Sequence, residues 1–250
     1  KVDGTVIYPV EKPYKPTGGL RVLGGNLSPD FSAILKLAGV EAGLEDNKFV
    51  GSARVFEGEP GLLKALDETP DVFKNNDIVI VRYSGPSGAP GMPEMLDPTS
   101  RITTLCREKN IVIALMTDAR FSGGSVGLVI GHVGPEAALG GPIALIEDGD
   151  EIIADLTTNA LICTALEDPA TLKARTAKWE KEVADNGGIH PNCGAADTRL
   201  LHRARHTAVP AVRGGGLHPN REVWVREPRE ATRSGFVPKN KYRPDSVKAF

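Results

Sequence analysis

The chain has 250 residues, which suffices for one large domain or two small ones with a sizeable hydrophobic core. Its 30 basic and 32 acidic side chains give a formal net charge of -2, which excludes the strongly basic surface of a nucleic-acid or anionic-membrane binder. With 28 glycines, 19 prolines and only 5% aromatic residues, we expect many shaped loops on a compact apolar frame.

No apolar run reaches the roughly 18 residues that span a bilayer, and no signal sequence precedes Lys1. We therefore expect a soluble piece of a longer protein that binds neither membrane nor nucleic acid. Its three cysteines, Cys106, Cys163 and Cys193, are odd in number and lack the paired spacing of zinc sites, which favours a reduced, cytoplasmic setting. The first two lie in apolar segments and are expected to be buried, whereas Cys193 lies in a loop-like stretch where it can be exposed.

The predicted elements alternate in short order up to Gly187. Apolar runs predict strands at residues 20–23, 53–56, 78–81 and 111–116. Helical patterns predict helices at residues 31–37, 61–69 and 102–109, the first of them stopped by Gly39. Because the strands at 78–81 and 111–116 are apolar throughout and a helix separates them, we expect parallel pairing in a buried sheet.

A meander and a long helix follow. Three further strands are predicted at residues 143–146, 152–156 and 161–166, which makes the sheet mixed. Asp168 is a favourable N-cap and Pro169 a favourable first helical residue, so the clearest helix is expected from there up to Gly187. Four of its residues share one face: Leu172, Thr176, Trp179 and Val183.

Residues 188–250 carry four of the five histidines and many arginines. We expect an extended tail that packs on the body or on a neighbouring subunit. His202 and His206 have the spacing of a two-histidine metal site on a helix. The residues between them include Arg203 and Arg205, whose positive charge repels a metal ion. An arginine-rich surface that contacts another subunit or an acidic substrate is therefore favoured.

The first candidate functional loop spans residues 83–96 (loop 1) and follows the predicted strand at 78–81, where open α/β sheets bind their ligands. Three glycines and three prolines give it a fixed irregular path, and Glu94 is its only carboxylate. A lone carboxylate in a rigid apolar loop suits Mg²⁺, which takes few protein ligands and keeps waters. The alternative is that Glu94 lies in the first turn of the next helix and meets its dipole.

The second candidate loop spans residues 117–127 (loop 2) and follows the predicted strand at 111–116. Glycines beside hydroxyl side chains allow backbone N–H groups to converge on an anion, so an anionic substrate group is expected here. Ser122 is a candidate nucleophile or base. Asp118 and Arg120 are expected to pair with each other and hold the loop.

His132 offers Ser122 a general base, which would give a serine hydrolase. The Gly-x-Ser-x-Gly elbow of many such enzymes is missing, because Arg120 and Phe121 precede Ser122. A hydrogen-bonded structural histidine is therefore the favoured interpretation of His132.

A series of motifs in the two loops and beyond carries a resemblance to a known family. They are Gly25-Asn26-Leu27-Ser28-Pro29-Asp30, Gly85-Pro86, Pro90-Gly91-Met92-Pro93-Glu94-Met95-Leu96, Pro98-Thr99-Ser100, Thr117-Asp118-Ala119-Arg120-Phe121-Ser122-Gly123-Gly124, Gly131-His132-Val133, Pro135-Glu136-Ala137, Gly140-Gly141-Pro142 and Asp148-Gly149-Asp150. In order and spacing they resemble the dihydroxy-acid and sugar-acid (phosphogluconate, pentonate) dehydratase family over residues 18–176. One departure is Ala119, where much of that family has glycine.

The resemblance implies the C-terminal domain of a two-domain enzyme. Its fold would be a mixed, β-barrel-like α/β domain of the swivelling type at residues 18–187, after a linker at 1–17 and before the tail at 188–250. The family's N-terminal domain holds the three cysteine ligands of an iron–sulfur cluster and most Mg²⁺ ligands, so the cysteines of this chain are expected to take no cluster role. The isolated chain is expected to be inactive, and its partners to be its own N-terminal domain and further copies in a homodimer or homotetramer.

The resemblance also implies roles for individual residues. Ser122 matches a serine that acts as an alkoxide base at C2 of the substrate, and Glu94 matches the Mg²⁺ ligand of the C-terminal domain. Arg120, Gly123 and Gly124 are expected to contact the substrate together with Ser122.

The tail is similar to the xylonate dehydratase branch at residues 188–193 and 235–242. The leading hypothesis is therefore dehydration of a xylonate-like sugar acid to a 2-keto-3-deoxy acid. The alternatives are a dihydroxy-acid dehydratase of branched-chain amino-acid synthesis, a non-catalytic binding domain, and the serine hydrolase.

Overall fold

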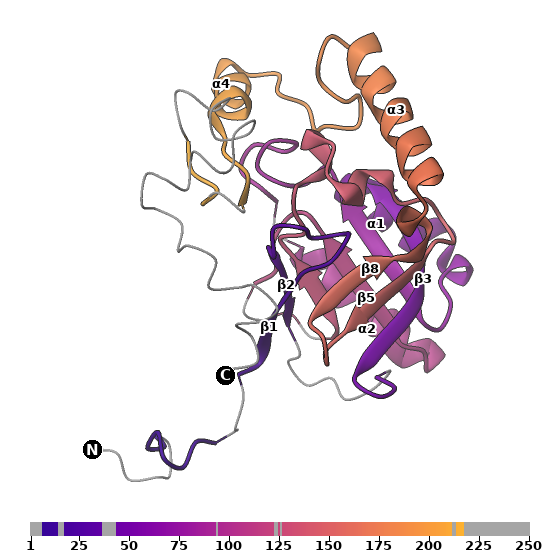
Figure 1. The fold of residues 1–250 in the computed structure, drawn as a ribbon, viewed down its shortest axis with the longest axis vertical. Helices are drawn as coiled ribbons and strands as arrows, with labels where there is room; N and C mark the ends of the chain where they lie inside the picture. Colours follow the sequence, from indigo (N-terminus) through magenta and orange to yellow (C-terminus); the bar gives the residue numbers. More distant parts are fainter. Residues whose placement is uncertain are drawn as a thin grey trace.

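Eight strands form one mixed sheet in the computed structural model, which describes residues 7–14, 18–36, 44–93, 95–122, 125, 127–211 and 214–217 (Figure 1). Their order across the sheet is β1-β2-β6-β5-β4-β3-β7-β8. The strands are β1 (Leu20–Leu23), β2 (Ala33–Lys36), β3 (Lys48–Glu57), β4 (Asp77–Arg82), β5 (Ile113–Thr117), β6 (Val129–Gly131), β7 (Glu151–Asp155) and β8 (Ala160–Cys163).

The centre of the sheet is parallel, as the apolar strands predicted. β3 pairs with β4, β4 with β5, and β5 with β6, all in parallel. The outer pairs, β1 with β2, β2 with β6, β3 with β7 and β7 with β8, are antiparallel. β4 is apolar at four successive positions because both of its faces are covered: Ile78 and Ile80 enter one core cluster, whereas Val79 and Val81 enter another.

The sheet curls until its two ends meet, which confirms the barrel-like fold. Gly24, directly after β1, bridges Ala160 at the start of β8. The Gly24 amide donates to the carbonyl oxygen of Asn159 at 2.9 Å, and the Leu161 amide donates to the Gly24 carbonyl at 2.5 Å. The Asn26 side chain continues this seam, because Nδ2 donates to the Cys163 carbonyl at 2.8 Å and Oδ1 accepts from the Cys163 amide at 2.9 Å.

Four α-helices flank the barrel in the described part of the chain: α1 (Gly58–Glu68), α2 (Leu96–Lys109), α3 (Pro169–Asp185) and α4 (Arg199–Thr207). α1 and α2 supply Leu62, Ile102 and Leu105 to the second core cluster and so cover the outer face of β4 and β5. α3 begins as predicted, with the Asp168 carboxylate accepting from the amides of Ala170 and Thr171. None of the described helices is long and apolar enough to cross a membrane.

The helix predicted at residues 31–37 was wrong. Residues Ala33–Lys36 form β2, with alternating fully and partly buried side chains that fit the period of a strand. Phe31 has a positive φ of 53°, and the Ser28 hydroxyl accepts from the amides of Ser32 and Ala33, so a tight turn directs the chain into the sheet. The local apolar run did not reveal this turn.

The strand predicted at residues 143–146 was also wrong. Residues Pro142–Leu145 form a 3₁₀ helix with proline at its start. β8 ends at Cys163, and Thr164–Glu167 form a further 3₁₀ turn. The predicted three-strand meander is therefore the two-strand hairpin of β7 and β8.

We predict that Asn26→Ala lowers the free energy of unfolding by about 1–3 kcal/mol, because it leaves both main-chain groups of Cys163 without their partner at the seam. The measurement is urea denaturation of the protein. Asn186→Ala is the matched control, since its side chain makes one exposed bond to the Ile189 carbonyl and its loss should cost less than about 1 kcal/mol. Equal losses in the two variants would contradict the assigned role of Asn26.

Candidate functional site

The buried carboxylate of Asp118 connects the two candidate loops. Loop 1 follows β4 and loop 2 follows β5, at the same edge of the parallel centre of the sheet. Asp118 Oδ2 accepts from the amides of Tyr83 at 3.1 Å and Ala137 at 3.0 Å, and Oδ1 accepts from the amide of Ser84 at 3.0 Å. Asp118 is 1% exposed. Its oxygens thus bind three N–H groups of two other segments and hold the loops together.

The predicted pair of Asp118 and Arg120 was wrong. A short, fully buried carboxylate needs donors on all sides, and main-chain amides supply them here. The exposed Arg120 instead directs Nε to the carbonyl oxygen of Met92, at 3.4 Å. Arg120 therefore links loop 2 to the part of loop 1 that leads to Glu94.

A second buried carboxylate, Glu136, lies beneath the first half of loop 1. Its side chain is 3% exposed, and Oε2 accepts from the amide of Ser87 at 2.8 Å. A Cβ atom on Gly85 would lie 2.4 Å from Glu136 Oε2, so only glycine allows this approach. In the sequence, Glu136 is marked only by its place in the Pro135-Glu136-Ala137 motif.

Burial raises the pKa of both carboxyl groups. The pKa of Asp118 rises to about 6, although the amides of Ala137, Ser84 and Tyr83 favour its charged form. Burial, and then repulsion by Asp118, raises the pKa of Glu136 to about 8. Burial and the charge of Asp118 thus both favour the neutral form of Glu136, which reduces the repulsion between the two buried carboxyl groups.

Ser122 lies in loop 2 and is partly buried. Its carbonyl oxygen accepts from the amide of Ser125 at 3.4 Å, which forms a turn, and from Nζ of Lys36 at 3.2 Å. Lys36 Nζ also donates to the carbonyl oxygen of Ser125, at 2.8 Å. Sequence reasoning missed Lys36, which is 86 residues from Ser122. Of the other predicted site residues, Glu94, Gly123 and Gly124 lie outside the described residues.

His132 lies near loop 2, in a turn that its own backbone stabilises. It has a positive φ of 55°, and its amide donates to the carbonyl oxygen of Ala119 at 2.8 Å. Burial and then the positive charge of Arg120 lower its pKa. This bond is made by the main chain of His132, so the structural role predicted for its side chain and the alternative role as a base for Ser122 both stay predictions.

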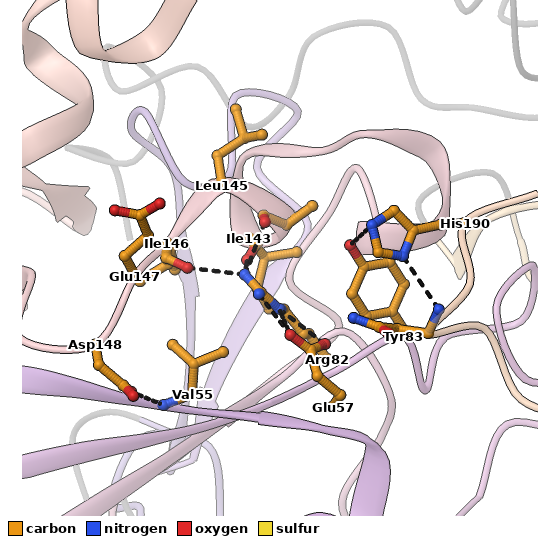
Figure 2. A network of polar contacts seen from close by, with 12 residues as sticks. Val55, Glu57, Arg82, Tyr83, Ile143, Leu145, Ile146, Glu147, Asp148 and His190 are labelled. Atoms are coloured by element: carbon orange, nitrogen blue, oxygen red, sulfur yellow. Dashed lines mark hydrogen bonds and ion pairs between the residues drawn. The ribbon is translucent and has the colours of Figure 1, made fainter. Parts of the chain in front are cut away.

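The segment after α3 covers the first half of loop 1. The Gly194 amide donates to the carbonyl oxygen of Gly88 at 3.1 Å. The buried Arg205 of α4 donates to the same oxygen at 3.3 Å and also to the Gly194 carbonyl. His190 stacks on Tyr83 with ring centroids 4.4 Å apart (Figure 2). Loop 1 is thus held by contacts with the tail and by hydrogen bonds to the two buried carboxyl groups.

A cleft of about 150 Å³ lies beside His190. Arg82, one of the two arginines that line it, forms a bidentate ion pair with Glu57 and donates to carbonyl oxygens of the turn after Pro142 (Figure 2). His190 Nε2 lies 3.1 Å from the Tyr83 hydroxyl and 2.8 Å from the Glu182 carboxylate. The charged side chains that line the cleft are therefore bonded to one another and to the main chain, and they connect the tail, the turn after Pro142 and β4.

The cysteines have the environment of packing residues. Cys163 is fully buried, and Cys193 is partly buried and packs against the same core cluster. Burial raises the pKa of each of these two thiols to about 11 and also raises that of Cys106. Cluster iron binds thiolates. The described residues contain no group of three His, Cys, Asp or Glu side chains that could hold a metal ion, so Cys106, Cys163 and Cys193 do not form a three-cysteine ligand set.

Comparison with known proteins identifies one family. The profile described as "Dihydroxy-acid/6-phosphogluconate dehydratase C-terminal" matches residues 5–215.

Curated relatives with the name "Dihydroxy-acid dehydratase" are similar to most of the chain. The protein of Syntrophobacter fumaroxidans is 47% identical over 178 residues, which are 71% of this chain and 30% of the relative. Those of Thermus thermophilus and Pyrococcus abyssi are 47% and 46% identical over 70% and 73% of the chain, and 29% and 31% of their own lengths. The chain thus spans about 30% of the length of the curated relatives it matches.

We predict that the stability of Glu136→Gln relative to the wild type is higher at pH 8 than at pH 5. The folded pKa of Glu136 lies above its unfolded value of 4.5, so the wild type loses stability as pH rises from about 4.5 to about 8. A neutral glutamine removes this loss. Since one pKa unit corresponds to about 1.4 kcal/mol, the gain should reach a few kcal/mol at most.

The measurement is the melting temperature of the wild type and the variant at the two pH values. Glu108→Gln, on the exposed side of α2, is the matched control for removal of a carboxylate. The melting temperatures of Glu136→Gln and the wild type should differ by different amounts at pH 5 and pH 8. Equal differences at the two pH values would contradict a raised pKa of Glu136.

Proposed function

This chain belongs to the dihydroxy-acid/6-phosphogluconate dehydratase family, whose C-terminal domain it contains, and we propose that it is the C-terminal part of a hydro-lyase. The proposed reaction removes water from a xylonate-like sugar acid and yields a 2-keto-3-deoxy acid. The observation that carries it is the junction of the two loops: Asp118 binds the start of loop 1, and Arg120, two residues before Ser122, binds the carbonyl oxygen of Met92, two residues before Glu94. The family match and the names of the relatives support the reaction class.

In the proposed mechanism, Ser122 is the base. Its Oγ, as an alkoxide, takes the proton from C2 of the substrate, and the electron pair of that C–H bond forms the C2–C3 double bond. The C3–O bond breaks and the hydroxyl group leaves, after protonation, as water. The resulting enol then tautomerises to the 2-keto acid. One water molecule is lost, C2 is oxidised and C3 is reduced by the same amount, so the reaction needs no external oxidant or reductant.

A serine hydroxyl is far too weak a base unless positive charge stabilises its alkoxide. Mg²⁺ bound through Glu94 would supply such charge. Because Glu94 lies outside the described residues and the described ones offer no set of three ligating side chains, we assign the other Mg²⁺ ligands to the proposed N-terminal domain. The iron–sulfur cluster is assigned there too, since the three cysteines of this chain do not lie together as a ligand set.

The substrate carboxylate is proposed to bind at loop 2. The backbone at Ser122, Gly123 and Gly124 would donate N–H groups to it, and the exposed Arg120 would attract the anion from solvent. The complete protein is proposed to be a cytoplasmic homodimer or homotetramer, in which this domain packs on its own N-terminal domain.

A second substrate class has its own support. The names of the relatives favour a dihydroxy acid, and the alternative substrate class is a branched one. The tail favours the sugar acid, but one of its two motifs, residues 235–242, lies outside the described residues, and the relatives cited match at most 73% of the chain. The two substrates differ beyond C3, where a sugar acid carries hydroxyl groups and a branched acid carries alkyl groups.

We predict that the full-length protein turns over xylonate with a kcat/KM at least about tenfold above that for 2,3-dihydroxy-3-methylbutanoate, since a site that binds hydroxyl groups rejects an alkyl analogue. The measurement is formation of the 2-keto acid from a panel of both classes. The reverse order would overturn the sugar-acid proposal and support the branched-acid alternative. Turnover of neither class would support the non-catalytic binding domain.

We predict that Ser122→Ala in the full-length protein lowers kcat at least about 1,000-fold, because no other group is assigned to remove the C2 proton. Iron and Mg²⁺ contents, measured by elemental analysis, should equal those of the wild type. Ser125→Ala is the matched control: this buried hydroxyl lies in the same loop and has no hydrogen-bond partner among the described residues, so its removal should change kcat by less than about threefold. Near-wild-type turnover by Ser122→Ala would remove Ser122 from the mechanism.

A further inference from the structure

Lys36 contacts loop 2 from a different part of the barrel. It is the last residue of β2, which pairs with β6, and Lys36 lies opposite Val129 there. From this position its ammonium group donates to the carbonyl oxygens of Ser122 and Ser125. The loop and the lysine are thus joined by two bonds across 86 and 89 residues of sequence.

These two bonds restrict the backbone of loop 2. The Ser122 carbonyl also accepts from the Ser125 amide. The ammonium group of Lys36 thus binds the carbonyl oxygens of two residues that are also bonded to each other. Because a peptide group is planar, holding its carbonyl oxygen fixes the orientation of the whole group. Glycine-rich loops otherwise sample many backbone conformations. Lys36 therefore restrains the main chain at Ser122 and Ser125, which the loop sequence by itself does not.

The same ammonium places a positive charge beside Ser122. It lies 3.2 Å from the main-chain oxygen of Ser122, the residue whose hydroxyl is the proposed base. Lys36 is partly buried, so solvent screens its charge less than that of an exposed lysine. A nearby positive charge favours the anionic form of an ionisable group. The location of Lys36 therefore suits stabilisation of a serine alkoxide.

We propose that Lys36 is a positioning residue for the dehydration, which holds the main chain of Ser122 and of Ser125 in place and whose charge stabilises the Ser122 alkoxide. The part concerning the alkoxide rests on the proposed function. The part concerning the turn rests on the two hydrogen bonds alone.

Three substitutions in the full-length protein separate the two parts. Lys36→Arg keeps the charge and the donors, Lys36→Gln keeps a donor without the charge, and Lys36→Met keeps neither. Lys64→Met, an exposed lysine of α1, is the matched control. Two readouts are used: amide hydrogen exchange of the peptide that spans residues 119–128, and the kcat and KM of dehydration.

We expect Lys36→Met to increase amide exchange at Ser125 at least about tenfold and to lower kcat about 10- to 100-fold, with a smaller change in KM. Lys36→Gln should retain part of the protection yet lose a similar factor in kcat, whereas Lys36→Arg should recover kcat to within about fivefold. Lys64→Met should match the wild type in both readouts.

Wild-type exchange and kcat in Lys36→Met would overturn the proposal. Increased exchange with an unchanged kcat in Lys36→Gln would overturn the electrostatic part and support the clamp alone. If the wild type dehydrates neither substrate class, the proposed function fails, and the exchange of Lys36→Met still decides whether Lys36 orders the turn.

Discussion

The burial of the Asp118 carboxylate is the constraint on which the site depends. A carboxyl group with 1% exposure cannot be solvated by water, so it must be surrounded by donors or lose its charge. Three main-chain amides meet this need, and they come from loop 1 and from the turn after Pro135. If any of these segments moved away, the carboxyl group would lose a partner in the interior, so loop 1, loop 2 and the turn are stabilised as one unit.

Side chains outside the loops fix the shape of each loop. Loop 1 lies between Glu136 on one side and the tail residues around His190 and Arg205 on the other. Loop 2 is held by Lys36 on β2. A glycine- and proline-rich loop allows close approach to a ligand, but its conformation then has to be imposed by neighbours. The barrel and the tail therefore act together as the scaffold of the candidate site.

The sequence predicted those features whose cause is local. The apolar run of β4 and the cap of α3 by Asp168 depend on residues next to one another, and both are confirmed. The segment of β2 looked helical because the short apolar run Ala33-Ile34-Leu35 does not distinguish the period of a helix from that of a strand, and the turn at Phe31 decides the outcome. The partners of Asp118 and Lys36 lie 19 to 89 residues away, so neither the failed Asp118–Arg120 pair nor the contact of Lys36 could be resolved from spacing.

The seam of the barrel also bears on the order in which the chain folds. The contacts that join the β1 end of the sheet to β8 link residues far apart in the sequence: Asn26 and Cys163, for example, are 137 positions apart. On a ribosome that releases the chain from its N-terminus, β1 and the strand beside it emerge long before the hairpin that completes the cylinder. Contacts of such high sequence separation slow folding, because the entropy of closing the intervening segment is lost before the contacts form. Closure of the barrel is therefore a late event in folding, and the parallel centre of the sheet can assemble ahead of it.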